Sequence, residues 1–277
     1  MTTLVGADRD PDRRELAAAL AAVRSQTGVI LALLAAAGVA WRVTADRMAG
    51  MDAGPGTDLG GLGWFTGTWA VMMAAMMLPS LAPTAAVYAA LTRRREPIRP
   101  ALFVGGYLLV WGVAGIVAFG VYAVGKTEFG RDLAWHGGGR WLAAGTLAVA
   151  ALYELTPLKG ACLLRCRSPL RFLRARWSEG RLGALAMGVR SGGWCLGCSC
   201  ALMAALFALG VMSLTWMALV AALLVLEKVA PWRRAARAAT ACVLAALTVA
   251  ILAAPHDVPG LVVPGAHGPL HAMKAMG

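Results

Sequence analysis

The chain is a succession of long apolar segments separated by short polar ones, without the alternation that marks β-strands. A block of roughly 20 apolar residues crosses the ~30 Å hydrocarbon core of a bilayer as a helix. Ala and Leu dominate these blocks, which favours helices over a β-barrel. The pattern predicts an all-α, polytopic membrane protein of about seven transmembrane helices, at residues 27–43, 64–91, 101–125, 139–157, 182–210, 213–229 and 236–254.

The composition favours a membrane protein over a soluble one. Hydrophobic residues make up 59% of the 277 residues and charged residues 14%, whereas a soluble domain usually carries about 25% charged residues. A soluble helical domain would need a very large core to bury so many apolar blocks. The first block is the shortest, and the alternative for it is the core of a cleaved signal peptide. Acidic residues before it are atypical of such a peptide, so we interpret it as a retained helix.

The net charge of +12 would suit a nucleic-acid partner, but the distribution of the basic residues argues against one. Most Lys and Arg residues occupy alternate short loops between the apolar blocks, as expected of the cytoplasmic loops of a membrane protein. This asymmetry predicts a multi-pass protein of a bacterial inner (cytoplasmic) membrane, with the N-terminus inside and the C-terminus outside. We expect a cytoplasmic segment at 1–26, the helical bundle at 27–254 and a flexible extracytoplasmic tail at 255–277.

Methionine is concentrated in the second predicted span, where four residues form two pairs at a spacing of four: Met72, Met73, Met76 and Met77. This spacing places them on one broad stripe of a helix. Thioether sulfur is a soft, uncharged ligand that suits Cu(I). Pro79 and Pro83 follow, and they leave backbone carbonyls without a helical donor and can open a local cavity, provided that neighbouring helices satisfy those carbonyls. The alternative is that the methionines fill gaps between packed helices.

Cysteines in the fifth predicted span provide a second group of soft ligands. Cys195 and Cys198 share a helical face, whereas Cys200 is turned well away from it. Their depth in the span is comparable to that of the methionine stripe. We therefore predict a shared Met/Cys site between the two helices.

A second cysteine pair follows the fourth predicted span. Cys162 and Cys166 are four residues apart, so they share a helical face, and basic residues surround them. Neighbouring cations favour the thiolate, which is the form that binds metals. We predict a loading or exit site for metal at the cytoplasmic surface. The spacings are not those of a zinc finger or ribbon, and Cys242 is interpreted as a small buried hydrophobe.

Two charged residues fall within the predicted spans at a similar depth, Glu154 and Arg190. A charge inside the membrane is costly unless it is paired, so we expect these two to form an intramembrane ion pair. The pattern leaves open whether such a pair is structural or part of an ion relay.

Three segments together carry a family resemblance: residues 72–80, 153–169 and 195–203. They resemble a family of bacterial integral membrane proteins of unknown function that are described as predicted metal-binding proteins. The resemblance covers roughly residues 60–250 and implies a multi-span helical fold with a suspected metal site. Adjacent cysteines followed by Trp are usual in that family, but here Ser199 separates Cys198 from Cys200. The resemblance therefore does not extend to Cys200 as a ligand.

The functional hypothesis is an integral membrane protein that binds a soft metal ion, Cu(I), for metal handling, delivery or transport. No nucleotide-binding loop occurs in the sequence, so we expect gradients or a metal-donor or metal-acceptor protein to drive any movement. A binding role is favoured over an enzymatic one. The alternative is a membrane thiol–disulfide oxidoreductase that uses the pairs Cys195/Cys198 and Cys162/Cys166. The proposed metal ligands are Met72, Met73, Met76, Met77, Cys195, Cys198, Cys162 and Cys166.

Overall fold

The computed structural model describes residues 21, 24–49, 59–92, 96–129, 138–175 and 177–254. No β-strand occurs in these ranges, so the all-α class predicted from the sequence is confirmed for them. The helices are α2 (Thr27–Met48), α3 (Leu62–Thr92), α4 (Arg99–Phe129), α5 (Arg140–Leu155), α6 (Pro157–Arg167), α7 (Pro169–Ala175), α8 (Gly180–Leu209), α9 (Leu214–Val229) and α10 (Arg233–Ala253). The predicted segments 1–26 and 255–277 lie almost wholly outside the described residues.

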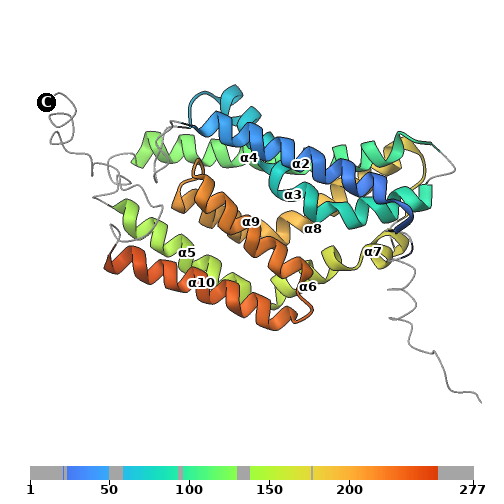
Figure 1. The fold of residues 1–277 in the computed structure, drawn as a ribbon. Coiled ribbons are helices and arrows are strands. Elements are labelled where there is room, and N and C mark those ends of the chain that lie inside the picture. Colours follow the sequence, from blue (N-terminus) through green and yellow to red (C-terminus); the bar gives the residue numbers. More distant parts are fainter. Residues whose placement is uncertain are drawn as a thin grey trace, which may run out of the picture.

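The long helices form an elongated bundle whose members run roughly along one direction (Figure 1). The most extensive contacts join α4 to α8, α2 to α3, and α5 to α10. Helix α9 lies between the α5–α10 pair and the helices of the other side, and α6 and α7 are near one end of the bundle. This arrangement brings the methionine helix α3 and the cysteine helix α8 into the same interior.

Five described helices are long and apolar enough to cross a membrane: α2, α3, α4, α8 and α10. Helices α5 and α6 would make a sixth span together, but they are bent by 67° where they join. Helix α9 has only 16 residues. Each of the seven predicted ranges therefore contains a helix, while the number of membrane crossings stays a prediction, as do the identity of the membrane and the orientation of the chain.

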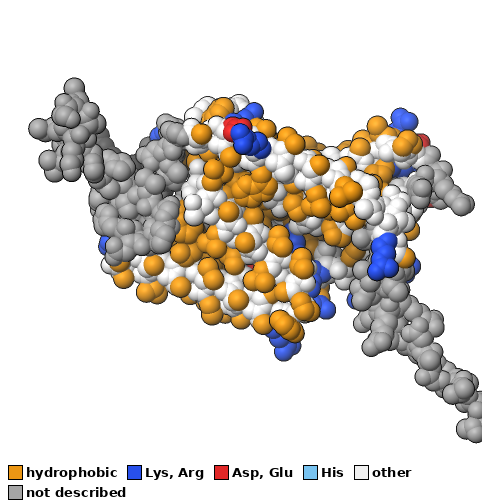
Figure 2. Space-filling view, viewed as in Figure 1, with side chains coloured by type: hydrophobic (Ala, Val, Ile, Leu, Met, Phe, Trp, Pro, Cys, Tyr) orange, Lys and Arg blue, Asp and Glu red, His pale blue; other side chains and the backbone are white. Residues whose placement is uncertain are grey.

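Many large apolar side chains of the described residues are exposed, which is expected of a bundle that faces lipid. Hydrophobic side chains are spread along the whole described part of the face seen in Figure 2. Large exposed apolar residues recur along α2, α4, α5 and α10, including Val39, Val117, Val121, Leu152 and Val249. Soluble monomers rarely expose apolar patches of this extent. The surface is thus compatible with a multi-pass membrane protein.

The joint between α5 and α6 is encoded by a Thr-Pro pair. Pro157 disfavours helical geometry at Thr156 and has no N–H to donate, so α5 ends before it. The same residue suits the first position of a new helix, and the Thr156 hydroxyl accepts a hydrogen bond from the Lys159 N–H at 3.3 Å. The predicted span 139–157 therefore stops at Leu155. The chain turns there, and α6 packs against α8.

Glycines allow α4 and α8 to pack with their backbones in contact. A Cβ atom on Gly188 would collide with the carbonyl oxygen of Phe103, and one on Gly106 would collide with that of Leu185. Small residues at helix crossings permit such close approach in membranes. The crossing places Tyr107 of α4 directly beside Cys195 of α8, where the two side chains are hydrogen-bonded.

Candidate metal site

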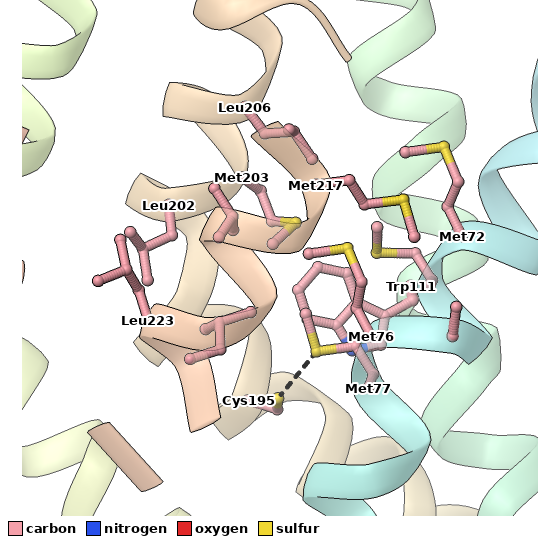
Figure 3. Close-up of a cluster of buried hydrophobic side chains, with 14 of the residues drawn as sticks. Met72, Met76, Met77, Trp111, Cys195, Leu202, Met203, Leu206, Met217 and Leu223 are labelled. Carbon is pink, nitrogen blue, oxygen red and sulfur yellow. Dashed lines mark hydrogen bonds between the residues drawn. The ribbon is translucent and has the colours of Figure 1, made fainter. Parts of the chain in front are cut away.

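The methionine stripe of α3 faces the interior of the bundle. Met72, Met73, Met76 and Met77 are all buried. They lie in one cluster with Trp111 and with further sulfur-containing side chains from α8 and α9 (Figure 3). A stripe that only faced lipid would not meet the cysteine helix. The four methionines are therefore available to the interior of the bundle, while their role as metal ligands stays a prediction.

Methionine and cysteine sulfur atoms meet between α3 and α8. The Sγ atom of Cys195 lies 4.0 Å from the Sδ atom of Met77, and both side chains are buried. Two further groups contact the same Sγ atom: the Tyr107 hydroxyl donates to it at 2.9 Å, and the Lys228 ammonium donates at 3.2 Å. Cys195 is therefore the centre of a polar cluster built from four helices.

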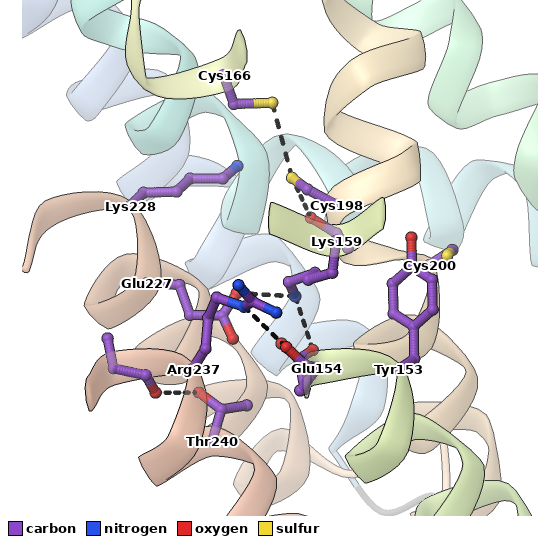
Figure 4. Close-up of polar contacts among 12 residues, drawn as sticks. Tyr153, Glu154, Lys159, Cys166, Cys198, Cys200, Glu227, Lys228, Arg237 and Thr240 are labelled. Atoms are coloured by element: carbon purple, nitrogen blue, oxygen red, sulfur yellow. Dashed lines mark hydrogen bonds and ion pairs between the residues drawn. The ribbon is translucent and has the colours of Figure 1, made fainter. Parts of the chain in front are cut away.

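The two cysteine pairs lie together rather than at separate levels. The Cys166 Sγ atom is 3.7 Å from the Cys198 Sγ atom (Figure 4). Cys162 is buried, and its Sγ atom lies close to Gly197 of α8. A Cβ atom added to Gly197 would be 3.2 Å from this sulfur. The expectation of a distinct surface site at Cys162 and Cys166 is thus corrected. The bend at Pro157 folds α6 onto α8, so both pairs belong to one sulfur cluster.

The remaining cysteines lie apart from this cluster. Cys200 is exposed and its thiol donates to the carbonyl of Gly197 within α8. This agrees with the helical geometry that turns it away from Cys198. Cys242 is also exposed, on α10, so its interpretation as a buried hydrophobe is wrong. Its small apolar side chain occupies a position on the outer surface instead.

The spacing of the sulfur atoms suits a soft metal ion. With a metal–sulfur distance of about 2.3 Å, as in zinc thiolates, two ligands of a tetrahedral or trigonal site lie about 4 Å apart. The pairs Cys195–Met77 and Cys166–Cys198 have this separation. In the described ranges, no group of three or more His, Cys, Asp or Glu side chains is arranged to hold a metal.

A buried ionic cluster lies next to the sulfur cluster, at the joint of α5 and α6 (Figure 4). The Lys159 ammonium is 2.6 Å from the Glu154 carboxylate and 2.8 Å from the Glu227 carboxylate. The three side chains are at most 1% exposed. Arg237 donates to the backbone carbonyls of Glu154 and Thr156 at 2.7 Å each. It thereby satisfies the Glu154 carbonyl, which the helix break leaves without a backbone donor, and adds a second donor to the Thr156 carbonyl, which also accepts from the Gly160 N–H.

The predicted partner of Glu154 is corrected by this geometry. Arg190 is exposed on α8, whereas the buried carboxylate of Glu154 is paired with Lys159. The joint at Pro157 explains the difference, because it returns Lys159 toward the end of α5 and buries a residue that the sequence placed in a surface loop.

Three residues of the sulfur cluster were not predicted: Lys228, Tyr107 and Ser80. The Lys228 ammonium contacts Ser80 Oγ at 2.9 Å as well as Cys195. In the sequence, Lys228 reads as a loop residue that follows an apolar block. The signal that could have found it is the adjacent pair Glu227-Lys228 within the last turn of that block, because charges inside a span are expected to be paired and functional.

The fold and this cluster define the class of protein: a bundle of apolar helices that encloses thioethers, thiols and a buried ionic cluster. A family model described as "PpoB2: Copper chaperone" matches residues 66–251. The chain belongs to this copper chaperone family. The matched range contains every proposed sulfur ligand.

Membership of this family indicates a metal-related protein. This agrees with the suspected metal site that the sequence resemblance implied. The family suggests copper handling, whereas the thiol–disulfide oxidoreductase alternative gains no support from it. The chain has no significant match among curated proteins or solved structures.

Proposed function

We propose that the protein binds Cu(I) within its helical bundle and hands it to a partner protein. The core of the proposed site is the thioether of Met77 with the thiolates of Cys195 and Cys198. The observation that carries the proposal is the 4.0 Å contact between Cys195 Sγ and Met77 Sδ, because it joins two kinds of soft ligand from different helices at a buried position.

The donor set explains why Cu(I) is the proposed cargo. Thiolate and thioether sulfur favour Cu(I) over hard divalent ions. A thioether also adds no charge to an apolar interior, where unpaired charge is costly. Copper handling is the description of the family, and the oxidation state and ligands are the proposal made here.

Cys166 and Cys162 of α6 are proposed as the route by which the ion reaches or leaves the core. Cys166 is 3.7 Å from Cys198, so a metal ion could pass between these sulfur atoms by exchanging one ligand at a time. Cys166 is also less buried than Cys162 or Cys198. Met72, Met73 and Met76 extend the soft-ligand stripe along α3 on the other side of Met77.

We place this activity in a bacterial inner membrane, with the N-terminus inside and the C-terminus outside. The apolar exterior and the distribution of Lys and Arg support this placement. The α6 cysteines then lie toward the cytoplasmic side, which suggests a cytoplasmic metal donor or acceptor. Direction of transfer would be set by that partner, since no nucleotide-binding loop is present in the sequence.

The direct test is an anaerobic Cu(I) titration of the purified protein in detergent, with a chromophoric Cu(I) chelator as competitor. We expect one tightly bound ion per chain, and loss of that ion in the double variant Cys195→Ser/Cys198→Ser. Cys200→Ser is the matched control, because it removes an exposed thiol from the same helix and should leave binding unchanged. Equal stoichiometry and affinity in the double variant and the wild type would refute the proposal.

A further inference from the structure

The last turn of α9 places a cation against the proposed metal ligands. Lys228 is the penultimate residue of this helix, and its Nζ atom lies 3.2 Å from Cys195 Sγ and 2.9 Å from Ser80 Oγ. Ser80 lies on α3, one turn beyond Met77. The ammonium group thus bridges the methionine helix and the cysteine helix at the position where their sulfur atoms meet.

No carboxylate neutralises this ammonium group within salt-bridge distance in the part of the chain that the structure describes. The preceding residue, Glu227, has its carboxylate 2.8 Å from Lys159 on α6. Figure 4 shows the Lys228 side chain directed away from Glu227, toward the side where Cys166 and Cys198 lie. The groups that the ammonium contacts are a hydroxyl, that of Ser80, and a thiol, that of Cys195. Its charge therefore acts on the sulfur cluster.

We infer that Lys228 is a specificity-determining residue, whose fixed positive charge beside Cys195 favours a monovalent metal ion over a divalent one. The inference rests on the copper-binding function proposed above. Coulomb repulsion between two cations is proportional to the charge of each, so a divalent ion at the same position is repelled twice as strongly as Cu(I). Thiolates alone do not exclude divalent ions, since Zn²⁺ also binds cysteine sulfur.

The overall charge of the site leads to the same preference. Two thiolates with Cu(I) and the Lys228 ammonium sum to zero, whereas the same groups with Zn²⁺ leave one positive charge in an apolar interior. Uncompensated buried charge is strongly unfavourable. A neutral residue at position 228 would reverse the preference. Two thiolates with a divalent ion would then sum to zero charge, whereas two thiolates with Cu(I) would leave one negative charge.

The experiment measures Cu(I) and Zn²⁺ affinities of the full chain in detergent for the wild type, Lys228→Gln and Lys228→Arg. Glutamine retains a polar tip but removes the charge, and arginine keeps the charge. We expect the Zn²⁺ affinity relative to Cu(I) to rise by about tenfold or more in Lys228→Gln, and to stay near the wild-type ratio in Lys228→Arg.

The outcomes separate this inference from the proposed function. A wild type that binds Cu(I), together with an unchanged affinity ratio in Lys228→Gln, overturns the role of Lys228 and leaves the copper site intact. A wild type that binds no Cu(I) overturns both. If Lys228→Gln does not fold, as judged by gel filtration and helical circular dichroism, Lys228→Leu takes its place, because it also removes the charge, and an unchanged affinity ratio in that variant overturns the inference.

Discussion

The Sγ atom of Cys195 lies 4.0 Å from the Sδ atom of Met77, although the two residues belong to helices that are far apart in the sequence. The contact is buried and is reinforced by Tyr107 and Lys228, which both donate to the cysteine sulfur. An apolar core needs neither a cation nor a hydroxyl at such a place. Their presence distinguishes this contact from ordinary packing of sulfur-containing side chains, and the proposed Cu(I) site is built on it.

Replacement of the thioether alone tests whether Met77 is a ligand. Met77→Leu conserves volume, so the fold should be little affected, while the Cu(I) affinity should fall by about tenfold from the loss of one soft ligand. Met187→Leu is the control, since Met187 is equally buried on α8 but is two turns removed from Cys195. Competition titration with a Cu(I) chelator gives both affinities. Equal losses in the two variants would assign Met77 to packing.

The closeness of α6 and α8 predicts a specific cross-link. The Sγ atoms of Cys166 and Cys198 are 3.7 Å apart, so a mild oxidant should join them after a small movement, because a disulfide needs about 2 Å. Mass spectrometry of peptides from oxidised protein in membranes would detect the link. Bound Cu(I) should protect both thiols from oxidation.

The matched comparison for the cross-link uses the exposed thiol of α8. In a Cys198→Ser background, Cys166 should not link to Cys200, which is turned away from it on the helix. A Cys166–Cys200 link that forms as readily as Cys166–Cys198 would contradict the position of α6 described here.

The buried ionic cluster should be critical for stability. Lys159→Met leaves the carboxylates of Glu154 and Glu227 without their shared cation at a site that is at most 1% exposed. Loss of one partner from a buried ion pair costs about 3–5 kcal/mol. We expect a lower thermal unfolding midpoint and a poor yield in detergent.

The control for this variant is a substitution of Arg190, the residue that the sequence alone predicted as the partner of Glu154. Arg190→Met removes an exposed charge, and surface substitutions usually change stability by no more than about 0.5 kcal/mol. If Arg190→Met destabilised the protein more than Lys159→Met, the assignment of Lys159 as the partner of Glu154 would be wrong.

The glycine crossing of α4 and α8 should control the geometry of the site from a distance. Gly188→Ala places a Cβ against the carbonyl oxygen of Phe103, so the helices must separate and Tyr107 must shift relative to Cys195. We expect a lower thermal midpoint and weaker Cu(I) binding. Gly193→Ala on the same helix meets no atom within 4 Å and should be neutral or slightly stabilising, since Ala favours the helix. Matching losses in both variants would argue against the close crossing.

The sequence predicted the helices well because their signal is local. Long apolar blocks and the spacing of Met72, Met73, Met76 and Met77 depend only on residues that are near one another. The shared face of Cys195 and Cys198, and the outward direction of Cys200, follow from helical geometry alone. These features could be predicted from the sequence without knowing which helices pack against one another.

The sequence did not predict features that depend on how helices meet. The Thr156-Pro157 pair marks a break, but its 67° bend and the return of α6 onto α8 follow from packing of the whole bundle. The same bend brings Lys159 to Glu154 in place of Arg190, and joins the two cysteine pairs into one cluster. Lys228 reads as a loop residue until α9 is known to end beside Cys195.

X-ray absorption spectroscopy of the Cu(I)-loaded protein tests the central claim most directly, because it counts the sulfur atoms around the metal. A copper shell that contains only sulfur is the expected result for the wild type, with one fewer sulfur in Met77→Leu and loss of bound copper in Cys195→Ser/Cys198→Ser. A shell dominated by nitrogen or oxygen, or an unchanged sulfur shell in the double cysteine variant, would contradict the proposed site between α3 and α8.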